Sequence, residues 1–105
     1  MDLGELTLEK AKAFEGTTFE VLLDEGRTVT LKLDEVASYA AHQHRRGRAA
    51  APKREPFALY FLGDPSLVLP QGMYALRSEA VTFDSLFIVP VGRDEQATEY
   101  EAVFT

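Results

Sequence analysis

Apolar residues recur at every second position in the first half of the chain, which is the period of a β-strand. Phe19, Val21 and Leu23 follow this spacing in residues 18–23, and residues 28–36 repeat it with valine and leucine. The residues between the two stretches include an acidic pair and a glycine, a composition typical of a hairpin turn. The pattern therefore predicts a β-hairpin.

The second of these strands loses its alternation towards its end, where Asp34 and Glu35 stand side by side before Val36. A β-bulge produces this pattern, because it inserts an extra residue and shifts the faces of the strand. A strand that ends at this point produces the same pattern. The sequence leaves both alternatives open.

Four more strands are predicted in the second half of the chain, at residues 57–63, 72–78, 86–92 and 98–104. The first and third of these carry apolar side chains on both faces. A strand with one face in water normally alternates apolar and polar residues instead. The core is expected to cover one face of each, and a helix, a loop or another chain is expected to cover the other.

The third of these strands is the longest apolar run of the chain. Phe87, Val89 and Val91 are predicted to point into the core, and Leu86 and Ile88 to point the other way. Across the whole chain, the side chains predicted to be buried are Phe57, Leu59, Phe61, Tyr74, Phe87 and Val89.

A short helix is predicted before the first strand. Thr7 is suited to cap its N-terminus, because a threonine oxygen can accept a hydrogen bond from the first helical turn. Apolar residues within 8–14 share one helical face, Leu6 can pack against that face, and Gly16 is suited to end the helix. A helix of about two turns does not persist alone. We therefore expect it to plug one end of the sheet.

One short N-terminal helix and six strands joined mostly by short links predict a mainly β fold. No crossover helices lie between the strands, so a parallel sheet is not expected. The predicted architecture is a six-stranded antiparallel meander, curled into a small barrel or a tight sandwich. The length of 105 residues predicts a single domain, residues 1–105.

Residues 37–54 differ from the rest of the chain, because they are rich in basic residues and have no apolar periodicity. We predict that they form a long, mobile, basic loop. They hold five of the eleven basic residues, which leaves six basic and seventeen acidic residues elsewhere. A body with a balance of −11 repels nucleic acid and anionic membranes, so neither is expected as a partner.

The expected location is the cytoplasm. The chain has no cysteine, which fits a reducing compartment. No apolar run reaches the roughly 18 residues of a membrane-spanning helix, and the acidic N-terminus lacks the basic and apolar regions of a signal peptide.

Four segments of the sequence look familiar: REPFALYFLG at residues 54–63, LPQGMYAL at 69–76, LFIVPVG at 86–92 and YEAVF at 100–104. With these motifs the chain resembles a family of short bacterial proteins known only as a domain of unknown function. The resemblance covers most of the chain apart from the basic loop. It implies no particular chemistry. It implies an accessory or assembly role, because such proteins are associated with phage-tail-like proteins.

Candidate chemistry is sparse. His42 and His44 could share a metal ion in an extended segment, but a site needs further ligands and the chain has no other histidine or cysteine. The sequence has no glycine-rich phosphate loop and no serine in a nucleophile elbow. We therefore predict no catalytic residue, no metal and no cofactor. Arg45, Arg46 and Arg48 are candidate contacts for an anion or an acidic protein partner.

Two functions are considered. The first is a non-catalytic module that forms a homodimer or docks onto another protein through the second apolar face of its sheet. The candidate interface residues are Tyr60, Leu62, Met73, Leu86 and Ile88. The second function is a small β-barrel that holds an apolar small molecule among its phenylalanines. These are Phe19, Phe57, Phe61, Phe83, Phe87 and Phe104. Because six short strands usually give an interior that side chains fill, we favour the first function.

Overall fold

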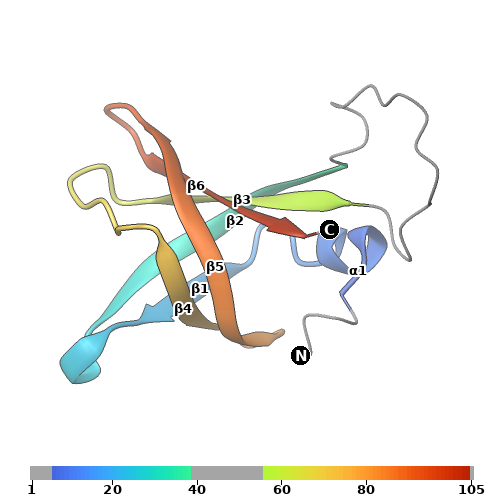
Figure 1. The fold of residues 1–105 in the computed structure, drawn as a ribbon, viewed down its shortest axis with the longest axis horizontal. Coiled ribbons are helices and arrows are strands. Elements are labelled where there is room, and N and C mark those ends of the chain that lie inside the picture. Colours follow the sequence, from blue (N-terminus) through green and yellow to red (C-terminus); the bar gives the residue numbers. More distant parts are fainter. Residues whose placement is uncertain (1–5, 39–55, 105) are drawn as a thin grey trace.

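A computed structural model describes residues 6–38 and 56–104 of the protein. Within these residues, six antiparallel strands close into a barrel with one short helix near the N-terminus (Figure 1). The elements are helix α1 (Leu8–Lys12), the 3-10 turn η2 (Asp24–Gly26) and strands β1 (Thr18–Leu22), β2 (Thr28–Ser38), β3 (Phe57–Gly63), β4 (Gly72–Arg77), β5 (Thr82–Arg93) and β6 (Thr98–Phe104). The prediction of a mainly β fold is confirmed, and the architecture is the barrel rather than the sandwich.

The helix begins as predicted, with the side chain of Thr7 accepting a hydrogen bond from the Lys10 amide at 3.2 Å. It ends at Lys12, earlier than expected, because the next amides bond three residues back instead of four. Gly16 then takes a φ of +90°, the left-handed conformation that glycine adopts without steric cost. In Figure 1, α1 lies at one end of the barrel, where it fulfils the predicted role of a plug.

The order of the strands around the barrel is β1-β2-β3-β6-β5-β4. A simple meander would pair β3 with β4, but here β3 pairs with β6, and β4 pairs with β5 and β1. The meander order is therefore wrong at this one step. Since β3 and β4 lie on opposite sides of the closed barrel, residues 64–71 must cross its end to join them. This crossing connection lies at the opposite end from α1 (Figure 1).

Three irregularities interrupt the pairing of the strands. In β2, Leu33 pairs with Phe61 and Glu35 with Tyr60, so that Asp34 is an extra residue. The loss of alternation in the sequence therefore marks a bulge, and the strand continues beyond it to Ser38. A side chain supports the strand beyond the bulge, because Glu15 Oε2 accepts a hydrogen bond of 2.7 Å from the Val36 amide.

The faces of β5 are opposite to those predicted. Leu86 and Ile88 point into the barrel and are 3% and 0% exposed, whereas Phe87 is 47% exposed and Val91 is also exposed. Val89 is half-buried. Both faces of this segment are apolar, so alternation alone does not reveal which face is inside. Pairing with β4 settles the inside face of β5, as described next.

A bulge near the start of β5 fixes the faces of the strand. Leu76 of β4 pairs with Phe83, and Tyr74 pairs with Leu86. The chain therefore advances by two residues in β4 and by three in β5. This extra residue places Phe83 and Leu86 on the same inner face although their spacing is odd. The third irregularity, between Pro90 and Gly92, lies at the far end of the same strand.

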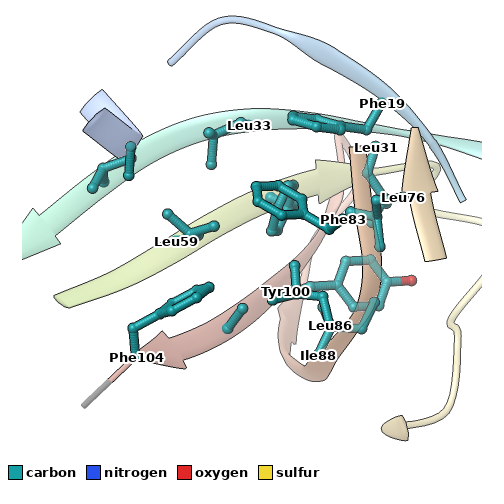
Figure 2. Packing of buried hydrophobic residues seen from close by; sticks show 14 of the residues in the cluster. Phe19, Leu31, Leu33, Leu59, Leu76, Phe83, Leu86, Ile88, Tyr100 and Phe104 are labelled. Carbon is teal, nitrogen blue, oxygen red and sulfur yellow. The ribbon is translucent and has the colours of Figure 1, made fainter. Parts of the chain in front are cut away.

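Aromatic rings and branched aliphatic side chains fill the interior of the barrel (Figure 2). Phe19 lies with its ring centroid 5.8 Å from that of Phe61, edge to face, and 5.7 Å from that of Phe83. Phe57 stacks on Phe104 at 4.8 Å. The predicted burial of Phe57, Leu59 and Phe61 is confirmed, whereas Tyr74 is only half-buried.

Candidate functional site

The structure separates the candidate interface residues into two groups. Met73 is 59% exposed on the outer face of β4, and Tyr60 and Leu62 are half-buried on the outer face of β3. Leu86 and Ile88 belong to the core, so their assignment to an interface is wrong. The reason is the reversed orientation of β5, which exchanges the inner and outer sets of side chains.

The basic and histidine candidates cannot be placed in the same way. Arg45, Arg46 and Arg48 lie outside the described residues, as do His42 and His44. Of the predicted mobile loop 37–54, Ala37 and Ser38 belong to β2 instead, and residues 39–54 lie outside the described residues. Within the described residues, no group of three or more histidine or acidic side chains could hold a metal ion.

Large exposed apolar side chains gather on one part of the barrel surface, which we call the outer strip. Met73 pairs with Phe87 across β4 and β5, and Leu22 of β1 pairs with Ala75, which shares the outer face of β4 with Met73. Pairing of β5 with β6 ends at Val89 and Glu101, short of Phe87 and Val103. With two residues of the crossing connection, the outer strip consists of Leu22, Leu67, Val68, Met73 and Phe87.

The outer strip contains five of the seven large hydrophobic residues that are exposed among the described residues. Sequence reasoning found only Met73 among them. Two signals were present in the sequence: Val21, Leu22 and Leu23 form an apolar run within an alternating strand, and Leu67 and Val68 are apolar residues in a loop. Neither signal shows by itself which of these side chains is exposed to solvent in the folded protein.

Two side chains of strand β6 bind the backbone of the crossing connection through hydrogen bonds. The buried hydroxyl of Tyr100 accepts a hydrogen bond from the Leu69 amide at 2.9 Å and lies 3.4 Å from the carbonyl oxygen of Leu67, to which it donates. Thr98, the buried polar residue among those described, donates from its hydroxyl to the Asp64 carbonyl at 3.1 Å. In Figure 2 the Tyr100 hydroxyl points out of the hydrophobic cluster, away from Phe104. Two side chains of one strand thus determine the path of the connection.

We expect Tyr100→Phe to lower the free energy of unfolding by about 1–3 kcal/mol, because the buried Leu69 amide loses its acceptor while the aromatic ring remains. Urea denaturation followed by circular dichroism measures the change. Tyr74→Phe is the matched control, since the Tyr74 hydroxyl donates to the Pro70 carbonyl at an exposed position where water can replace it. Equal losses in both variants would contradict this role of Tyr100.

The crossing connection has a groove on each side. One groove, of about 440 Å³, lies between the connection and the β1–β2 turn, and its lining includes Leu22, Val68, Met73 and Tyr74. Burial raises the pKa of the Tyr74 phenol, with a further contribution from Tyr100, and the Tyr74 hydroxyl donates to the Pro70 carbonyl. This groove is continuous with the outer strip, since Leu67 and Val68 border both.

The other groove, of about 520 Å³, lies between the connection and the N-terminal half of β2. Its apolar lining includes Leu31, Leu67, Leu69 and the ring of Tyr100. Two charged residues, Lys32 and Asp64, also line it. The groove therefore combines an apolar floor with a charged rim, which is a composition common in ligand-binding clefts.

The surface formed by the described residues is acidic, with fourteen acidic and six basic residues. Hydrogen bonds from the Ser66 amide and then from its hydroxyl lower the pKa of Asp64. Backbone amides of Gln96 and Ala97 lower the pKa of Asp94 in the same way. Both carboxylates cap tight turns and remain charged, so they add to the acidic field without forming a pair of reacting groups.

Comparison with known proteins gives a family but no activity. The family described as Domain of unknown function (DUF6916) matches residues 6–104. The chain belongs to this family. The match extends from the residue before the helix cap to the end of β6, so the DUF6916 domain corresponds to the whole barrel, and the resemblance found in the sequence to a domain of unknown function is confirmed. No curated protein and no solved structure matches the chain.

A membrane-spanning helix is not found among the residues that the structure describes.

Proposed function

We propose that this protein is a non-catalytic interaction module that docks onto another protein through the outer strip. The observation that carries the proposal is the gathering of five exposed apolar side chains on adjoining elements of a barrel whose interior is already filled. Contiguous apolar patches of this kind are typical of protein interfaces. Covering each large side chain that is now about half exposed would contribute on the order of 1 kcal/mol.

The charge of the protein favours a different protein over a second copy as the partner. Two copies would bring together two surfaces on which acidic residues outnumber basic ones by fourteen to six. The nearest acidic residue on β6 is held aside, because Tyr60 donates a hydrogen bond of 2.8 Å to the Glu101 carboxylate on the β3 side. A partner with an apolar surface and a basic rim fits this arrangement.

Docking onto another protein would give this protein an assembly or accessory role. The resemblance of the sequence to proteins associated with phage-tail-like proteins supports it, since such assemblies need small modules that bind larger components. A bacterial source and a location in the cytoplasm belong to the same proposal.

The binding of an apolar small molecule is the second candidate function. The groove of about 520 Å³ beside β2 favours it, because Leu67, Leu69 and Tyr100 offer an apolar floor. The barrel interior is a poorer site, since Phe19, Phe61 and Phe83 pack against one another there. Native mass spectrometry of the purified protein separates the two functions, because a retained small molecule adds a discrete mass.

Photo-cross-linking tests the proposed interface. We expect a photoreactive phenylalanine analogue at position 87 to capture one discrete partner protein in an extract of the cells that encode the protein. The matched control carries the same analogue at position 91, because Val91 is also exposed, at 48%, on the same strand but outside the outer strip. Serine in place of Met73 should weaken the capture from position 87.

The outcomes of this experiment are distinct. A similar pattern of products from positions 87 and 91 would contradict a specific interface at the outer strip. A cross-link between two copies of the chain would replace the proposed partner with a homodimer.

A further inference from the structure

Strand β2 has an open edge at its beginning. Residues Thr28–Thr30 pair with β1 on one side, whereas pairing with β3 on the other side begins only at Leu31, opposite Gly63. Beyond Gly63 the chain leaves the sheet as the crossing connection. Because β6 holds that connection through Tyr100, it does not close onto β2. The first residues of β2 therefore border the larger groove without a second strand beside them.

The backbone hydrogen-bonding groups of this edge point into the groove. The Leu33 amide donates to the Thr17 carbonyl at 2.9 Å, and the Arg27 carbonyl accepts from the Leu23 amide at 2.8 Å. Odd-numbered residues of this part of β2 thus direct their backbone groups towards β1. Since these groups alternate along a strand, those of Thr28 and Thr30 face the opposite side. This is the geometry that another extended chain can use.

The walls of the groove match an extended segment. Leu31, Leu69 and the Tyr100 ring form an apolar floor on the core side. Asp64 provides a negative charge at the rim and Lys32 a positive one, and the hydrogen bonds of Asp64 with Ser66 both use Oδ1. Alternate side chains of an added strand point to opposite faces, so one would meet the floor and the next would meet the rim.

We propose that this groove binds an extended peptide segment of a partner protein, which adds as a strand beside Thr28–Thr30. One apolar side chain of the segment packs on Leu67, which lines the groove and is 41% exposed, and a lysine or arginine pairs with Asp64. Charge complementarity favours a basic segment, since the described surface carries fourteen acidic and six basic residues. Main-chain hydrogen bonds provide affinity in this mode of recognition, and side-chain pockets provide specificity.

A second open edge on the barrel is protected, and the contrast supports the assignment to β2. Pairing of β5 with β4 ends at Ile88, so the remainder of β5 also has one free side. However, Pro90 has no amide hydrogen to donate, and the pairing with β6 is irregular between Pro90 and Gly92. The edge at Thr28–Thr30 contains no proline and no bulge.

A titration followed by nuclear magnetic resonance tests the inference. The probe is a blocked peptide of alternating valine and threonine with a lysine at each end. Adding it to the labelled protein should shift the amide signals of Thr28, Thr30 and Asp64, while those of Met73 and Phe87 in the outer strip stay in place. The inference goes beyond the proposed function, because the two surfaces respond separately in this experiment.

Two substitutions at one position provide the decisive comparison. Thr28→Pro removes the amide that faces the groove, and the preceding Arg27 already has the extended φ of −78° and ψ of 150° that a following proline requires. We expect the affinity for the peptide to fall about tenfold, the effect of one or two lost hydrogen bonds. Thr28→Val keeps the amide and should stay within about twofold of the original affinity.

A further variant and two control measurements can contradict the proposed strand addition. Asp64→Asn should weaken binding and reduce its dependence on salt, because a charge-assisted contact is lost. Equal affinity in Thr28→Pro and Thr28→Val, or no shifts at millimolar peptide, would overturn strand addition. Sedimentation that shows a dimer which the peptide dissociates would assign the edge to a second copy of the chain instead.

Discussion

Replacing Ile88 with aspartate is expected to unfold the barrel, whereas the same change at the adjacent residue Phe87 should leave it folded. Ile88 is fully buried in the core, and Phe87 is 47% exposed. An unpaired carboxylate in an apolar interior costs several kcal/mol, a large part of the roughly 5–15 kcal/mol that stabilises an ordinary domain. Circular dichroism in the far ultraviolet and the dispersion of amide signals measure the outcome.

The pair of variants is its own control, because the two residues are neighbours and receive the same new side chain. If Phe87→Asp unfolds the protein and Ile88→Asp does not, the orientation of β5 is the reverse of the one described. If Phe87→Asp remains folded, the variant can also be used to test docking, since it places a charge in the outer strip.

Truncation of the central aromatic cluster should produce the second large effect. We expect Phe19→Ala to lower the free energy of unfolding by about 3–5 kcal/mol, because a buried phenylalanine leaves a cavity when it is removed. The Phe19 ring has two aromatic neighbours, at centroid distances of 5.8 Å and 5.7 Å. Urea denaturation at constant m-value measures the loss.

Two further variants make this prediction specific. Phe87→Ala removes the same side chain from the surface and should cost less than about 1 kcal/mol. The double variant Phe19→Ala with Phe83→Ala should lose less than the sum of the single variants, because the two rings stack on each other. A strictly additive loss would show that Phe19 and Phe83 do not share one packed cluster.

These results bear on function because the barrel separates its stabilising residues from its exposed ones. The core is complete without the outer strip, so changes at Met73 and Phe87 can report on docking without unfolding the protein. The open edge of β2 can be altered in the same way at Thr28, which is exposed. Separate surfaces of this kind allow each proposed contact to be removed alone.

The candidate site could be predicted from the sequence only in outline. An apolar second face was expected, and Met73 was correctly assigned to it. Leu86 and Ile88 were assigned to it as well, although Phe87 is the residue of that run that lies on the surface. The open edge of β2 left no signal in the sequence, because it depends on where a different strand, β3, stops pairing.

The sequence by itself determined the local elements. The spacing of apolar residues located all six strands, and Thr7 marked the beginning of the helix. The spacing also grouped Phe57, Leu59 and Phe61 on one face of one strand, and that face is buried. These features depend on propensities and periods that act over a few residues, so a short stretch of sequence contains the information that specifies them.

Only the tertiary structure decided the strand order and the orientation of β5. The pairing of β3 with β6 joins residues some forty positions apart, such as Phe61 and Tyr100, and no local pattern distinguishes it from a pairing of β3 with β4. The bulge between Phe83 and Leu86 reverses the faces of all later residues in the strand. Since an apolar strand has the same pattern on both faces, its inside is set by the neighbours that close the barrel around it.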